Sequence, residues 1–168
     1  MRVSDKKRFG RAGFDVTAFS FGTAPIGNLF RRIDEPTSEA MIAQSWQAGV
    51  RYFDAAPFYG HGLAELRLCH ALRWQNRDDY VLSTKVGRVL KPGRRSAIDF
   101  TPWTQGAANH LEFDYSYDGT MRAFEDSLQR LALEHVEILF IHDIDKFTRG
   151  SEQPEVFKQA MDGCWRAL

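Results

Sequence analysis

Four side chains of types that suit proton transfer stand at or just beyond the ends of short apolar segments. Asp54, Lys85 and His142 each close such a segment, and Tyr59 follows Asp54 by five positions. An ammonium beside a phenol favours the phenolate, a carboxylate keeps the ammonium charged, and a neutral imidazole can hydrogen-bond a carbonyl oxygen. The set holds no activated serine or cysteine and no carboxylate pair. It therefore indicates proton exchange at a carbonyl or alcohol oxygen while another group moves a hydride.

Each of these residues also has an ordinary structural explanation. Strand-end aspartates often cap a helix or loop, strand-end lysines are usually solvated, and a histidine after a buried strand is commonly a hydrogen-bonded core residue. Tyr59 alone would be a packing aromatic. Their joint occurrence at successive strand ends favours the functional interpretation, because several independent coincidences would otherwise be needed.

The elements that must position these residues alternate in type. Short apolar segments typical of buried strands stand at 19–21, 50–54, 80–84 and 136–141. Residues at helical spacing predict helices over 36–48 and 62–73, a third helix through Met121, Phe124, Leu128 and Leu131, and a last amphipathic face from Phe157 to Leu168. This alternation predicts a parallel sheet. In a parallel barrel the strand ends share one face, where active sites lie, so the four residues are expected to meet.

The number of units predicts half a barrel. Four βα units are half of a (β/α)8 TIM barrel, which takes about 250 residues, and the chain has 168. We therefore expect an α/β fold in which residues 1–168 form one domain, the amino-terminal half of the barrel, preceded by a hairpin at 7–17. The pattern stops at Leu168 with no helix cap or following strand. This predicts a truncated chain or a fragment that must pair.

The segment 86–117 has no clear period and contains prolines and glycines. A loop of this length is usually functional or disordered. Its aromatic residues, Trp103 among them, either cover a substrate pocket or pack locally, and both interpretations stay open. For His61 we prefer a loop residue at the mouth of the site to a second proton carrier.

Composition excludes several classes of protein. Lysine plus arginine equals aspartate plus glutamate at 22 each, so there is no basic excess for nucleic acid or for a membrane surface. The apolar run at 138–141 is too short to span a bilayer, and the first nine residues lack the apolar core of a signal peptide. The two cysteines have no metal-ligand spacing. A cytoplasmic protein without a metal site follows as the expectation.

At these residues the sequence resembles the aldo-keto reductase family. The family's first signature stands at 49–60 as GVRYFDAAPFYG, its lysine motif at 82–87 as LSTKVG and its histidine motif at 139–143 as LFIHD. The segment SLQRL at 127–131 also resembles the family. Ala55 stands where the family usually has threonine, a departure at none of the four catalytic positions. The resemblance covers nearly the whole chain.

The resemblance implies a role for each residue. Tyr59 would be the general acid or base, Lys85 would favour its ionised form, Asp54 would pair with Lys85, and His142 would orient the substrate oxygen. The family binds NADP or NAD without a Rossmann fold, and this chain has no GxGxxG motif. The nicotinamide end would contact Asp54 and the segment Gly22, Thr23 and Ala24, for which a plain strand-to-loop turn is the alternative. Phe58 and Trp103 would line the substrate pocket.

Within the family, residues 56–62 and 84–88 are most similar to bacterial aldose 1-dehydrogenases of the D-threo-aldose or L-fucose type and to pyridoxal 4-dehydrogenases. Such enzymes oxidise a sugar lactol or a pyridoxal hemiacetal to a lactone, which would make Tyr59 the base. The expected partner is thus a small carbonyl or sugar substrate. The residues that choose between NAD and NADP belong to the barrel's second half.

Two other functions compete with this interpretation. One is a catalytically silent half barrel that acts in assembly or binding. The other is a metal-dependent hydrolase that uses Asp54 and His142, but it lacks the paired histidines such sites usually need.

Overall fold

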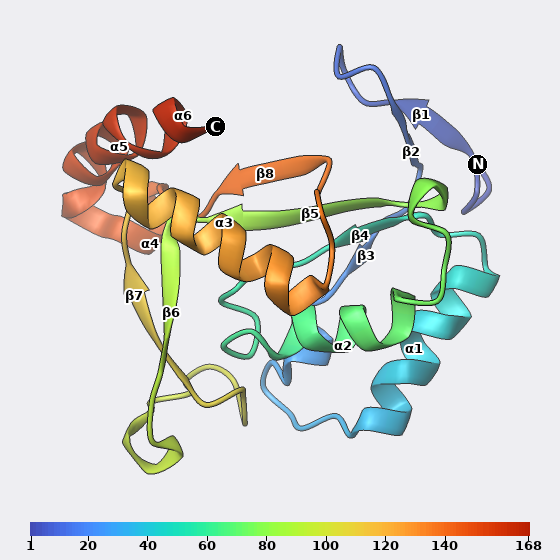
Figure 1. The fold of residues 1–168 in the computed structure, drawn as a ribbon, viewed down its shortest axis with the longest axis horizontal. Helices are drawn as coiled ribbons and strands as arrows, with labels where there is room; N and C mark the ends of the chain where they lie inside the picture. Colours follow the sequence, from blue (N-terminus) through green and yellow to red (C-terminus); the bar gives the residue numbers. More distant parts are fainter.

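A parallel four-stranded sheet organises the protein, as seen in a computed structural model that describes residues 1–168. Its strand order is β3-β4-β5-β8, and every neighbouring pair is parallel. The strands are β3 (Phe21–Gly22), β4 (Tyr52–Asp54), β5 (Val81–Val86) and β8 (Ile138–Ile141). Figure 1 shows the helices α1 (Glu35–Gln47), α2 (Leu63–Leu72) and α3 (Tyr117–Leu131) packed along one side of this sheet. The alternation of strand and helix predicted from the sequence is confirmed.

Local signals in the sequence set the helix boundaries. The Asp34 carboxylate accepts a hydrogen bond from the Thr37 amide and caps α1, whose first turn contains Pro36. The Ser116 hydroxyl accepts from the Gly119 amide and caps α3 in the same way. The predicted helices at 36–48 and 62–73 therefore match α1 and α2 to within one residue at each end.

The main core lies between the sheet and the helices α1 and α2. It contains Phe53 and Leu82 from the sheet and Ile42 and Leu68 from the helices, all of them fully buried. The ring of Trp46 stacks on Phe53 with centroids 6.3 Å apart. This packing is what fixes the sheet on the helices, and through it the ends of the strands.

The helical spacing of the apolar residues in 62–73 predicts that Leu66 faces inward, and this prediction is wrong. Leu66 is 44% exposed, whereas Glu65 is 0% and Arg67 is 6% exposed. The Glu65 carboxylate accepts from Thr84 Oγ1 and from Arg130 Nε, each at 2.7 Å. Because every charge there has a partner, the helix can bury polar residues where an apolar stripe was expected.

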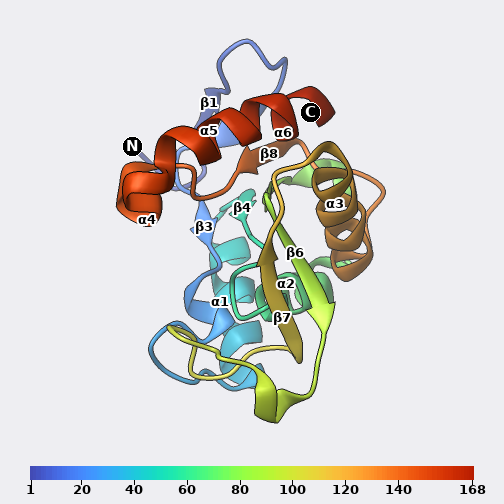
Figure 2. The ribbon, with the colours of Figure 1, turned by 90° about the vertical axis from the view of Figure 1, so that its left-hand side faces the viewer.

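The segment 86–117 also differs from the prediction of a long aperiodic loop. It forms an antiparallel hairpin of β6 (Arg88–Pro92) and β7 (Asn109–Phe113), joined by a turn that includes the 3₁₀ helix η3 (Arg95–Ala97). The hairpin extends away from the end of β5 (Figures 1 and 2). One of its faces carries exposed charges such as the Lys91–Glu112 pair, so the apolar pattern is sparse.

Smaller elements complete the fold. The predicted early hairpin is present as β1 (Lys6–Arg8) and β2 (Asp15–Thr17), and the first strand of the parallel sheet begins at Phe21, two residues later than predicted. The remaining short elements are η1 (Pro25–Gly27), η2 (Arg77–Asp79), α4 (Lys146–Arg149), η4 (Gly150–Glu152), α5 (Gln153–Asp162) and α6 (Cys164–Ala167). No helix in the structure has the length and apolar character needed to cross a bilayer.

Candidate active site

The register of the parallel sheet brings Asp54 and Lys85 together. Asp54 lies opposite Ser83 in the ladder between β4 and β5, and Lys85 follows two residues later on the same face. Lys85 Nζ donates to Asp54 Oδ2 at 2.7 Å and to the Ala55 carbonyl at 2.8 Å. Both side chains are mostly buried. The carboxylate and the carbonyl together hold the ammonium in one place.

Tyr59 lies directly beside this ion pair. Lys85 Nζ is 4.7 Å from the centroid of the Tyr59 ring. The loop that carries Tyr59 is pressed against η1 so closely that a Cβ on Gly27 would come within 2.7 Å of the Tyr59 carbonyl carbon. The glycine at this position therefore allows the approach that fixes the tyrosine backbone.

His142 faces Tyr59 from the end of β8. The two rings meet edge to face with centroids 6.0 Å apart. Burial lowers the pKa of His142 from 6.5 to about 4, against the opposing influence of the Asp143 carboxylate. The imidazole is therefore neutral near pH 7, the form needed for a hydrogen bond to a carbonyl oxygen. The structure thus places all four predicted side chains (Asp54, Tyr59, Lys85 and His142, hereafter the tetrad) around one space.

Two residues that the sequence interpretation missed extend the tetrad inward. The Ser83 hydroxyl donates to the second oxygen of Asp54 at 2.6 Å, and the Tyr52 hydroxyl lies 3.2 Å from Ser83 Oγ. Burial raises the pKa of Tyr52, so this phenol stays protonated. A signal for Ser83 existed in the sequence, because side chains two apart on a strand share a face and Ser83 is two residues before Lys85.

The two predicted substrate residues lie against the tetrad. Trp103 is buried, and its ring centroid is 5.1 Å from that of Phe58 and 5.7 Å from that of Tyr59. Phe58 is in turn 6.1 Å from His142. The aromatic segment therefore contacts the tetrad through Trp103, whereas Tyr117, at the start of α3, is half exposed.

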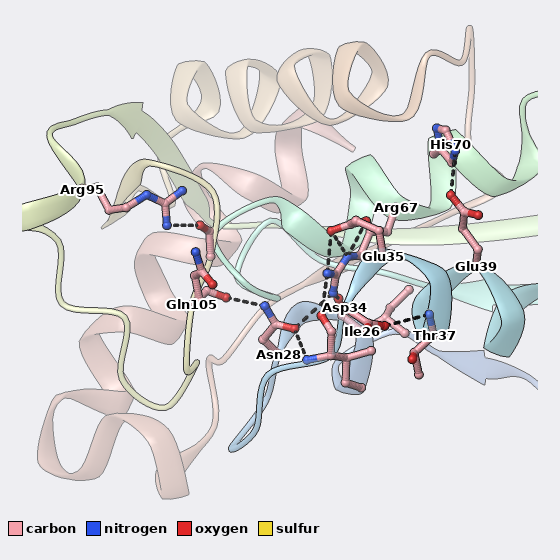
Figure 3. Close-up of polar contacts among 12 residues, drawn as sticks. Ile26, Asn28, Asp34, Glu35, Thr37, Glu39, Arg67, His70, Arg95 and Gln105 are labelled. Atoms are coloured by element: carbon pink, nitrogen blue, oxygen red, sulfur yellow. Dashed lines mark hydrogen bonds and ion pairs between the residues drawn. The ribbon is translucent and has the colours of Figure 1, made fainter.

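A network centred on Arg67 holds the loop that carries Trp103. Asn28 donates from Nδ2 to the Gln105 carbonyl at 2.9 Å, and its own carbonyl accepts from the Thr104 amide at 3.0 Å. The Arg67 guanidinium donates to Asn28 Oδ1 at 3.1 Å and to the carbonyl of Ile26 at 2.5 Å, and it pairs with Glu35 (Figure 3). No pattern in the sequence indicated this role for Arg67, since an arginine on a helix is ordinarily solvated.

His61 lies in the loop after β4 and is buried there. Its Nδ1 lies 2.7 Å from the Asn109 carbonyl, and Asn109 Nδ2 donates to the His61 carbonyl at 3.0 Å. Burial lowers the pKa of His61, and its ring packs on Phe100. The residue therefore fastens the β6–β7 hairpin to the loop after β4.

The segment predicted to contact a nicotinamide ends β3 beside the tetrad. Gly22 pairs in register with Asp54, and a Cβ on Gly22 would meet no atom within 4 Å. Gly22 therefore leaves room beside Asp54 at this end of the sheet. The buried Thr23 has another task, because its hydroxyl and amide both donate to the Asp54 carbonyl, at 2.9 and 3.0 Å. Ala24 follows as the residue before η1.

The arrangement contains no group of three or more histidine, cysteine, aspartate and glutamate side chains placed to hold a metal ion. Asp54 and His142, the pair a metal-dependent hydrolase would use, are instead engaged with Lys85 and with the Phe58 and Tyr59 rings.

Comparison with known proteins identifies the family. The model of the aldo/keto reductase family matches residues 18–167. The chain belongs to the aldo/keto reductase family. The matched residues include all four members of the tetrad.

Relatives of the chain within the aldo/keto reductase family include two dehydrogenases. It is 39% identical over 160 residues to pyridoxal 4-dehydrogenase from Microbacterium luteolum, covering 89% of this chain and 46% of that protein. It is 37% identical over 166 residues to D-threo-aldose 1-dehydrogenase from a Pseudomonas species, covering 94% and 50%. The chain thus spans about half the length of these curated relatives.

Solved structures of aldo-keto reductases share the fold. An aldo-keto reductase from Pseudomonas aeruginosa superposes with a TM-score of 0.65 at 25% identity, covering 94% of this chain and 56% of that one. The holo form of one from Bacillus halodurans gives 0.67 at 24% identity, covering 93% and 46%. The prediction of a partial (β/α)8 barrel is confirmed.

Proposed function

We propose that the protein is an NAD(P)-dependent oxidoreductase that transfers a hydride between a nicotinamide and a sugar lactol, an aldehyde or a pyridoxal-like substrate. One observation carries the proposal. The Lys85 ammonium is bonded to Asp54 and lies under the Tyr59 ring, while a neutral His142 faces the same phenol. This arrangement supports the proposal because it suits general acid–base catalysis at one substrate oxygen.

Each residue of the tetrad has one task in this proposal. Tyr59 takes the proton from a substrate hydroxyl during oxidation and returns it during reduction. Lys85 stabilises the phenolate that forms, and Asp54 holds the ammonium in position. His142 donates or accepts a hydrogen bond at the same oxygen and orients the carbon that reacts. A bound nicotinamide would supply or accept the hydride, and the room at Gly22 beside Asp54 is the place we propose for it.

The substrate class rests on the aromatic wall and on the relatives. Phe58 is partly exposed and packs edge to face on the buried Trp103, which gives the site an apolar wall suited to a sugar or pyridine ring. The relatives named above act, by their names, on pyridoxal and on D-threo-aldoses. The completeness of the tetrad favours this enzyme over a catalytically silent half barrel.

Reduction of NAD and NADP by the protein, followed by absorbance with L-fucose, D-galactose and pyridoxal as substrates, tests the proposal. We expect at least one cofactor and substrate pair to give turnover that depends on both. Failure of every pair, in protein that binds a nicotinamide cofactor, would count against it.

A further inference from the structure

Several side-chain hydrogen bonds hold the turn after β8, which contains His142 and Asp143. Asp143 has a φ of +56°, a left-handed conformation that residues other than glycine rarely adopt. The Tyr115 hydroxyl donates to the His142 carbonyl at 2.6 Å, and Arg149 Nε donates to the Asp143 carbonyl at 2.9 Å. Arg149 Nη2 also donates to the Tyr115 hydroxyl at 2.7 Å. Backbone strain that is held in place by its surroundings is typical of functional turns.

The strained backbone aims the Asp143 carboxylate in a defined direction. One of its oxygens pairs with Arg88, a guanidinium that is 8% exposed and lies 3.9 Å from the Phe58 ring centroid and 4.2 Å from that of Phe113. The other oxygen is 3.5 Å from His142 Nε2. A single carboxylate thus joins the arginine of the β6–β7 hairpin to the imidazole of the tetrad.

The second imidazole nitrogen has no partner. His142 Nδ1 is buried without a hydrogen bond to the protein. A neutral imidazole carries its proton on one nitrogen only, and a nearby carboxylate favours the proton on the nitrogen that faces it. The charged groups around the ring are Asp143, Arg88, Lys85 and Asp54. Of these, the Asp143 carboxylate has an oxygen within 4 Å of a ring nitrogen.

We propose that Asp143 is a positioning residue: held by Arg88, its carboxylate fixes the orientation of the His142 ring and keeps its proton on Nε2. Because Nδ1 is buried, the Nε2–H is then the donor that the ring can offer to a substrate oxygen. The catalytic meaning of this arrangement rests on the proposed function, whereas the tautomer itself does not. Arg88 balances the carboxylate, so that Asp143 holds the neutral ring without drawing a second proton to it.

The tautomer can be read directly from the ¹⁵N shifts of labelled histidines at pH 7. We expect the Nε2–H form of His142 in the unaltered protein and a mixture of both tautomers in Asp143→Asn. Asparagine tolerates positive φ, so this variant keeps the turn. His61 is an internal reference for folding, because its Nδ1 must donate to the Asn109 carbonyl whatever happens at residue 143. An unchanged His142 tautomer in Asp143→Asn would overturn the proposal.

Kinetics of the same variant test the catalytic part. We expect Asp143→Asn to lower kcat about tenfold with little change in KM, a loss typical of residues that orient a catalytic histidine. Lys91→Gln, which breaks an exposed ion pair on the same hairpin, is the matched control and should leave both kcat and the tautomer unchanged. An altered tautomer with undiminished kcat would contradict the catalytic role. Absence of turnover in the unaltered protein would instead remove the proposed function and leave the tautomer result standing.

Discussion

The two walls of the candidate active site are positioned by different means. Asp54 and Lys85 belong to neighbouring parallel strands, and the register of the backbone sets their 2.7 Å contact. Trp103 lies in the connection of the β6–β7 hairpin and contacts Tyr59 from there, and Asn28, itself bonded to Arg67, helps to hold that connection. The position of the proton-transfer groups therefore depends on the sheet, whereas the position of the substrate wall depends on a network of polar side chains. Changes to one should leave the other largely intact.

The sheet side should respond most strongly to loss of its ammonium. Lys85→Met removes the charge beside Tyr59 and leaves the Asp54 carboxylate without its cation, so we expect kcat/KM to fall about 1000-fold, within the range for acid–base groups. Steady-state kinetics measure the loss. If the two walls are independent, hydrogen exchange of residues 100–107 should not change in this variant. Faster exchange there would contradict the independence of the substrate wall from Lys85.

The network side should affect binding and stability more than chemistry. Arg67→Met strips the buried carbonyls of Ile26 and Ile33 of their donor, and we expect a loss of about 2 kcal/mol in the free energy of unfolding. Because the Trp103 loop is released, KM should rise about tenfold while kcat changes less, a cost of the size of one or two lost contacts. Chemical denaturation and kinetics give both values. Glu39→Gln, which breaks the exposed pair with His70, is the control and should do neither. A fall in kcat without a rise in KM would show that Arg67 acts on the proton-transfer groups of the sheet and not on the substrate wall.

Burial of His142 should make the stability of the protein depend on pH in the acid range. The pKa of His142 is about 4 in the folded protein and about 6.5 unfolded, so between these values the unfolded chain binds the extra proton. Stability should therefore fall as the pH drops from 6.5 toward 4, with a contribution from this residue of up to roughly 3 kcal/mol. Unfolding titrations of His142→Asn should show a shallower dependence over this range, whereas Lys91→Gln, which breaks an exposed ion pair, should keep the original slope. If stability depended on pH with the same slope in all three proteins, the pKa of His142 would not differ between the folded and the unfolded chain.

The same division explains what the sequence could predict. The tetrad was predictable because each member lies at or shortly beyond the end of an apolar strand, and parallel strands end on one face whatever their detailed packing. The hairpin at 88–113 was not, since one of its faces is charged and its position depends on single hydrogen bonds such as His61 to Asn109. Glu65 and Arg67 break the helical pattern for a similar reason. Their burial becomes favourable only with partners brought by distant segments, such as Arg130 and Asn28.

The most direct test of the account concerns the phenol itself. Tyr59→Phe removes one oxygen from the tetrad, and Tyr117→Phe makes the same change at a half-exposed tyrosine outside it. Turnover should be lost in Tyr59→Phe while nicotinamide cofactor still binds by fluorescence titration, and both should persist in Tyr117→Phe. Turnover by Tyr59→Phe at the rate of the unaltered protein would contradict the role of Tyr59 and the proton-transfer mechanism built on it.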